Sequence, residues 1–151
     1  MSILRKNIQL SLFAAITLIA FTTVGCKTMG GTGAEAKSSV TQLSGAQEVP
    51  PVSTEASGQS TIKIAADKSV SGTLLVSRMN ATAAHIHEGA KGANGPVIVP
   101  LTKTSATTFA VPADTKITDA QYASYKAGNL YVNVHSGAYP GGEIRAQLNP
   151  K

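Results

Sequence analysis

From residue 40 onward, turn-forming residues divide the chain into short runs that are rich in β-branched side chains. Turn signals such as Asp67-Lys68 and Pro140-Gly141-Gly142 separate these runs at intervals of roughly 8–12 residues, the spacing of strands in a sandwich or barrel. Trp is absent and only 5% of the residues are aromatic, so the core has to be built from aliphatic side chains. The pattern predicts an all-β fold, a Greek-key β-sandwich or barrel of about eight short strands.

One segment in the C-terminal third departs from the strand pattern. Thr118-Asp119-Ala120-Gln121 has the form of a capping box, in which the Thr118 hydroxyl accepts from the backbone N–H of Gln121. Gly128 follows at the position of a helix stop. We therefore expect one short helix over residues 119–127. The strands are expected at residues 41–47, 59–65, 69–78, 83–88, 97–101, 107–111, 130–135 and 143–148.

The last two strands predict their own pairing. In residues 130–135 and 143–148, aliphatic side chains alternate with polar or aromatic ones. A hairpin that matches the two aliphatic faces places Asn133 opposite Arg145 and His135 opposite Glu143. The aliphatic faces are expected in the core, so His135, Glu143 and Arg145 share the outer face. Substitutions of Asn133 and of its outer-face neighbour Tyr131 are expected to be tolerated better than substitutions in the core.

The first 39 residues have a different character. Arg5 and Lys6 precede a charge-free apolar run over residues 8–22, and small residues lead to Cys26, the single cysteine. This arrangement predicts an export signal over residues 1–25, although the apolar run is also nearly long enough for an uncleaved transmembrane helix. Residues 26–39 are rich in Gly and small side chains, which predicts a flexible tether ahead of one domain over residues 40–151.

Residues 23–26, Thr-Val-Gly-Cys, resemble the lipobox of bacterial lipoproteins, with Thr23 where Leu is usual. The resemblance implies that Cys26 carries a lipid that holds the protein on a membrane surface without spanning it. Lys27 after the cysteine implies sorting to the outer membrane. The expected localisation is therefore exported and lipid-anchored in the cell envelope. A nucleic-acid partner is not expected, because the lysines are scattered singly and do not alternate with aromatic residues.

All three histidines of the chain lie in strand-like runs. A period of two places His85 and His87 on one face, with Cα atoms roughly 6.5–7 Å apart, so their imidazoles can converge on one ion. His135 on a neighbouring strand would complete a three-nitrogen site with an open position, which suits copper or zinc. Glu88 and Glu143 are expected to orient the ring N–H groups. The alternative is that these are solvated histidines without a metal.

Five motifs in order resemble the CHRD domain, over about Val40 to Leu148. They are Leu43 to Val52, Ala83 to His87, Gly95-Pro96-Val97, Leu130 to His135, and Pro140 to Arg145. The resemblance implies an extracytoplasmic β-sandwich and brings little settled biochemistry.

A weaker likeness is to Cu/Zn superoxide dismutase, whose copper site also uses a His-x-His strand followed by Glu and a later Val-His. It implies that Arg145 corresponds to the active-site arginine and shapes access for anions. No histidine remains to bridge two metals, and a single cysteine permits no intrachain disulfide, so dismutase activity is not expected.

Three functions follow as hypotheses. The favoured one is an envelope-anchored module that binds copper, or as second choice zinc, through His85, His87 and His135. The second is a metal-free adhesion or scaffolding module, and the third is a copper redox enzyme resembling superoxide dismutase. An enzyme is not the favoured interpretation and no catalytic residue is assigned, because the sequence has no phosphate loop and no nucleophile elbow.

Overall fold

The computed structural model describes residues 40–150. The expected export signal, the lipid-attachment site Cys26 and the tether lie outside these residues. Within them, no helix is long and apolar enough to cross a membrane. The elements in chain order are β1 (Thr41–Ser44), β2 (Ser57–Ser60), β3 (Lys63–Ile64), β4 (Val70–Ser71), β5 (Thr73–Ser77), β6 (Ala81–Glu88), β7 (Val97–Pro100), β8 (Thr102–Lys103), β9 (Thr108–Ala110), α1 (Asp119–Lys126), β10 (Leu130–Ser136) and β11 (Ile144–Leu148).

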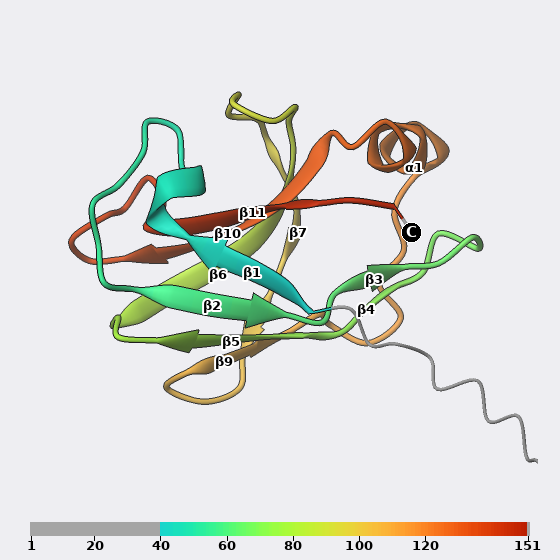
Figure 1. Cartoon of the computed structure of the whole chain (residues 1–151). Helices are drawn as coiled ribbons and strands as arrows, with labels where there is room; N and C mark the ends of the chain where they lie inside the picture. Colours follow the sequence, from blue (N-terminus) through green and yellow to red (C-terminus); the bar gives the residue numbers. More distant parts are fainter. Residues whose placement is uncertain (1–39, 151) are drawn as a thin grey trace, which may run out of the picture. The chain divides into compact units, whose positions relative to one another are not determined.

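Nine strands form one antiparallel sheet in the order β7-β6-β10-β11-β1-β2-β5-β9-β8, and β3 and β4 form a separate pair (Figure 1). β7 and β8 stand at opposite ends of this order, yet only Leu101 separates them in sequence. Residues 97–103 thus pair first with β6 and then with β9. This continuous segment brings the two sheet edges together into a nearly closed barrel, which confirms the predicted all-β architecture.

The aliphatic side chains of β6, β10 and β11 point into the barrel, as the alternation predicts. Ile86, Val132, Val134 and Ile144 are each 0% exposed. Burying a side chain of this size contributes about 1.5–3 kcal/mol relative to leaving it in water. The core therefore fixes which face of these three strands is turned outward, and the histidines lie on that outward face.

Helix α1 confirms the predicted capping box. The Thr118 hydroxyl accepts from the Gln121 N–H at 3.2 Å, and the Gln121 side chain accepts from the Thr118 N–H at 2.9 Å. The chain leaves the helix through Gly128 at φ +76°, a left-handed conformation that glycine adopts without strain. Tyr125 packs its ring into the core from this helix.

The strand boundaries differ from the predicted ones at three main places. The expected strand over residues 59–65 is divided into β2, which belongs to the nine-stranded sheet, and β3, which pairs with β4. The expected strand over residues 69–78 is divided into β4 and β5 at Gly72, whose φ of +122° is incompatible with a regular strand. The expected strand over residues 41–47 ends at Ser44, and residues 45–47 form a 3-10 turn. The two-residue strand β8 was not predicted, because so short a run has no readable period.

Candidate metal centre

β6, β10 and β11 lie side by side and present their outward residues in rows across the barrel surface. The register of the two strand pairs sets these rows. It includes the predicted pairing of Asn133 with Arg145. The rows, read from β6 through β10 to β11, are Ala83–His135, His85–Asn133–Arg145 and His87–Tyr131–Gln147.

The structure brings the three histidines predicted from the sequence into one cluster. His85 Nδ1 lies 3.0 Å from His135 Nε2, and the His85 and His87 ring centroids are 5.6 Å apart. One ring nitrogen of each histidine lies within 4.8 Å of the others. Ligands about 2 Å from a shared ion are separated by roughly 3–4 Å, which is close to the spacing of these three nitrogens.

Backbone carbonyls determine which nitrogen is available on two of the rings. His87 Nδ1 lies 2.9 Å from the Gly95 carbonyl oxygen, and His135 Nδ1 lies 2.9 Å from that of Pro140. A carbonyl can only accept, so each Nδ1 carries the proton and each Nε2 keeps its lone pair. Metal-binding histidines commonly donate their second N–H in this way. The Nε2 atom of His87 is buried and has no hydrogen-bond partner.

The protonation of the cluster favours metal binding. Burial lowers the pKa of His85 below its ordinary value of 6.5, and the charges of His135 and His87 lower it further. Burial also lowers the pKa of His87, and this outweighs the opposing effect of the hydrogen bond to Gly95. Both imidazoles are therefore held in the neutral form that a metal ion requires.

The carboxylates expected to orient the rings have other partners. Strand alternation turns Glu88 to the face opposite His87, where its carboxylate accepts from Ser124 Oγ of α1 at 2.5 Å. Glu143 accepts from Thr54 Oγ1 at 2.7 Å. The His87 and His135 N–H groups donate to backbone carbonyls instead, an arrangement that residue type alone does not reveal.

Arg145 is buried. The likeness to superoxide dismutase implied that it faces solvent and shapes the access of anions to the site. It is 1% exposed, and its guanidinium carbon lies 3.3 Å from the centroid of Tyr131, which itself stacks on His87. The guanidinium donates to the Ala93 carbonyl at 2.8 Å and to Asn94 Oδ1 at 3.2 Å. Arg145 thus holds the loop of residues 89–96, which carries the Gly95 carbonyl that fixes His87.

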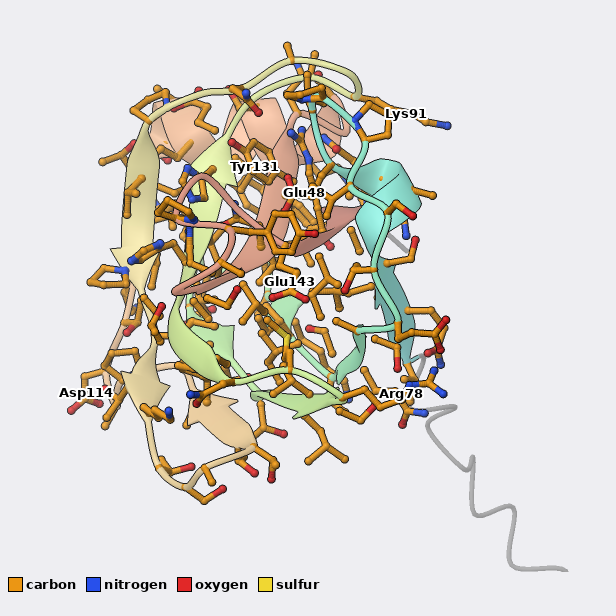
Figure 2. The ribbon with its side chains drawn as sticks, turned by 90° about the vertical axis from the view of Figure 1, so that its left-hand side faces the viewer. Glu48, Arg78, Lys91, Asp114, Tyr131 and Glu143 are labelled. Carbon is orange, nitrogen blue, oxygen red and sulfur yellow. The ribbon has the colours of Figure 1, made fainter. Side chains whose placement is uncertain are left out.

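Covering segments make the outer face more buried than the sequence predicted. Tyr131 is 2% and Asn133 3% exposed, so both side chains are as buried as core residues, and burial argues against the expected tolerance of substitution there. The 89–96 loop and the segment around Glu48 cover them, and Asn94 Nδ2 joins these two segments by donating to the Val49 carbonyl at 2.8 Å. Figure 2 labels Tyr131 and Glu48 toward the end of the barrel at which Lys91 lies, with Arg78 at the other end. Alternation predicts faces but not what covers them.

Glu48 is a site residue that the sequence reasoning missed. It is 5% exposed, and burial raises the pKa of its carboxyl group, an effect that the nearby charge of Arg145 opposes. Its position within the Leu43 to Val52 motif was the available signal.

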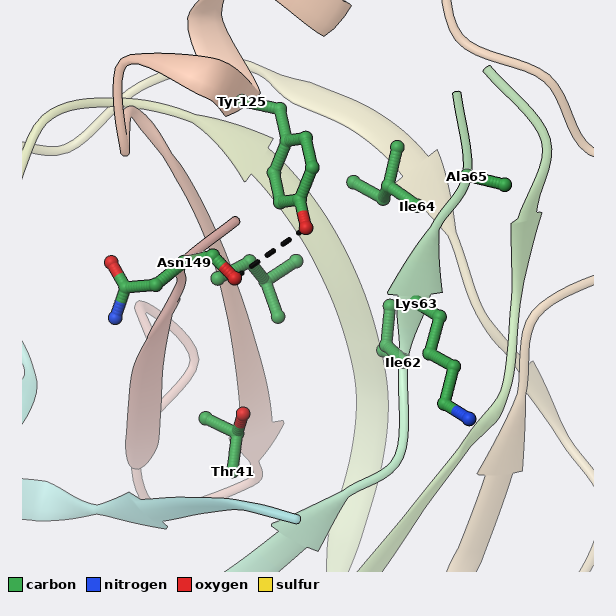
Figure 3. Close-up of a pocket in the computed structure, with 8 residues that line it drawn as sticks. Thr41, Ile62, Lys63, Ile64, Ala65, Tyr125 and Asn149 are labelled. Atoms are coloured by element: carbon green, nitrogen blue, oxygen red, sulfur yellow. Dashed lines mark hydrogen bonds between the residues drawn. The ribbon is translucent and has the colours of Figure 1, made fainter. Parts of the chain in front are cut away.

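A separate cavity of about 350 Å³ lies between β3, α1 and the end of β11 (Figure 3). Its lining includes Ile62, Tyr125 and Leu148, and the Tyr125 hydroxyl donates to the Asn149 carbonyl across it at 3.4 Å. None of the histidine-cluster residues contributes to this cavity.

Comparison with known proteins gives one family. The model of the CHRD domain matches residues 40–148. This stretch runs from the start of β1 to the end of β11 and includes all three histidines. Searches of the curated proteins and of the solved structures returned no significant match.

Proposed function

The chain belongs to the CHRD domain family over residues 40–148, and from this premise we propose that its domain is a metal-binding module. The ion is copper, or as second choice zinc, and its ligands are His85 Nδ1, His87 Nε2 and His135 Nε2. Without the metal His85 Nδ1 donates to His135 Nε2, so on binding His85 shifts its proton to its own Nε2. The observation that carries the proposal is the convergence of one nitrogen from each of three rings within 4.8 Å, with the buried His87 Nε2 left unpaired.

The donor set supports copper ahead of zinc. All three ligand atoms are imidazole nitrogens, which suit both metals, and divalent copper binds a given nitrogen site more tightly than zinc does. Three protein ligands leave a position open for another molecule. Such a module serves metal sequestration, delivery or tolerance.

We further propose that the module works at the cell envelope, where a lipid on Cys26 holds it at the outer membrane. Support comes from the sequence, in which Arg5, Lys6 and the apolar run precede Gly25-Cys26. The expected tether over residues 26–39 spans on the order of 20 Å, which keeps the domain close to the lipid headgroups.

Calorimetry with the purified protein at pH 7 tests the metal proposal. We expect one Cu(II) ion per chain, with binding weakened by replacing any one of the three histidines with alanine. The Tyr139→Phe variant is the matched control, since it removes only a hydroxyl that donates to the Ser53 carbonyl at 3.4 Å and not to a histidine. Absence of stoichiometric Cu(II) and Zn(II) binding would contradict the proposal.

A further inference from the structure

Three buried polar atoms in the described part of the chain lack a hydrogen-bond partner. They are Glu48 Oε1, His87 Nε2 and Asn133 Oδ1. Their residues are 5%, 8% and 3% exposed. An unpaired buried polar atom is destabilising, and native proteins keep few of them. Three such atoms on one face suggest a shared missing partner.

These three side chains are close to one another. Asn133 lies opposite His85 in the β6–β10 pair, and His87 lies two residues further along β6 on the same face, so Asn133 and His87 are diagonal neighbours. A Cβ added to Gly142 would lie 2.6 Å from Glu48 Oε1 and 2.7 Å from Asn133 Nδ2. Asn133 therefore links His87 on one side to Glu48 on the other.

One metal ion carrying one water molecule satisfies all three atoms. The ion takes the lone pair of His87 Nε2, and with His85 and His135 it reaches three protein ligands, which leaves a position for water. Water has two hydrogens to donate, and the two remaining unpaired atoms, Asn133 Oδ1 and Glu48 Oε1, are both acceptors.

We propose that the open position of the metal is an oxygen-ligand site, in which a bound water molecule donates to Asn133 and Glu48. This inference rests on the proposed metal site and adds the class of its fourth ligand. The Glu48 carboxylate also offsets the charge of the ion, in a region where Arg145 already contributes one positive charge. The site favours a small ligand with hydrogens to donate over an anion such as azide, which has none.

Electron–nuclear double resonance on the Cu(II)-loaded protein tests this directly. In the wild-type protein we expect strongly coupled protons that disappear in D2O, from a water bound to the ion. Asn133→Leu removes one acceptor at similar side-chain volume, and we expect the proton coupling to change in this variant. We also expect azide to bind about tenfold more tightly, because the water that competes with it has lost one hydrogen bond. Tyr139→Phe should match the wild type in both measurements.

The outcomes separate this inference from the metal proposal. If Cu(II) does not bind at all, the metal proposal fails and the inference fails with it. If Cu(II) binds but the exchangeable protons are absent, or azide binds equally to wild type and Asn133→Leu, only the inference is overturned. Should Asn133→Leu not fold, Glu48→Gln keeps the side-chain shape and must itself change the proton coupling. An unchanged coupling in that variant overturns the inference.

Discussion

His87 has the most closely determined surroundings of the three histidines. The Gly95 carbonyl fixes its tautomer, the Tyr131 ring stacks on it at 4.8 Å and 7°, and its Nε2 atom is buried without a partner. Each contact comes from a different part of the chain. An imidazole that is oriented before the ion arrives loses less conformational freedom on binding, which favours affinity.

The lowered pKa values of His85 and His87 predict how the stability of the metal-free protein depends on pH. The unfolded chain binds protons at these residues near pH 6.5, whereas the folded protein binds them only at lower pH. The free energy of unfolding therefore decreases as the pH falls below about 6.5, and this contribution levels off below the folded pKa values. Urea unfolding at pH 7.5 and 5.5 measures the loss, which should be smaller in His85→Ala. An equal loss in that variant would contradict the assignment.

At the scale of elements, Arg145 is expected to stabilise the 89–96 loop and, through it, the metal centre. Arg145→Lys keeps the charge but loses the fork whose two nitrogens reach Asn94 Oδ1 and the Ala93 carbonyl. We expect Cu(II) affinity to fall 10–100-fold, the range for lost orienting partners, and amide exchange of the loop to accelerate. The matched control is Arg78→Lys, because Arg78 donates to the Glu55 carbonyl away from the histidines. Unchanged exchange in Arg145→Lys would refute this role.

Strand β10 carries a prediction for the core. Val134 is 0% exposed, so Val134→Ala should lower the free energy of unfolding by about 1–3 kcal/mol. Leu75→Ala is the control, since Leu75 is 50% exposed and should cost much less. Denaturant unfolding compares the two. Similar losses at both positions would mean that β10 is not packed as described.

Local patterns predicted much of these elements, and long-range contacts account for the rest. The Thr118 capping box and the Asn133–Arg145 register follow from short-range rules, and both are present. The hydrogen-bond partners of His87 and His135 could not be predicted. Every residue has a backbone carbonyl, so nothing in the sequence marks those of Gly95 and Pro140 as the acceptors. The burial of Glu48 likewise arises because its own segment packs against β10, which lies far away in sequence. The spacing of apolar residues does not reveal such a contact.

At the scale of the whole molecule, closure of the barrel holds the histidine strand on both edges. β6 lies between β10 and β7. The chain continues from β7 into β8, which pairs with β9 at the other end of the sheet order. The Leu101 N–H donates to the Ala84 carbonyl at 2.9 Å within this closing segment. Two of the three histidines therefore sit on a central strand, and we expect its amides to exchange among the slowest in the domain.

The anchor proposal predicts how the whole protein is processed. Cys26→Ser should abolish membrane association, because no lipid can then be attached at that position. Fractionation of cells into membrane and soluble parts measures the association, and intact-mass analysis measures the lipid on the wild-type chain. An unmodified cysteine, or retention of residues 1–25, would contradict the proposal.

Every function proposed for the histidine cluster requires that the three histidines bind one metal ion. The most direct measurement is a crystal structure of the Cu(II)-loaded protein with anomalous diffraction at the copper edge. We expect one anomalous peak per domain, about 2 Å from His85 Nδ1, His87 Nε2 and His135 Nε2. A peak elsewhere, or none while His85 Nδ1 keeps its hydrogen bond to His135 Nε2, would contradict it.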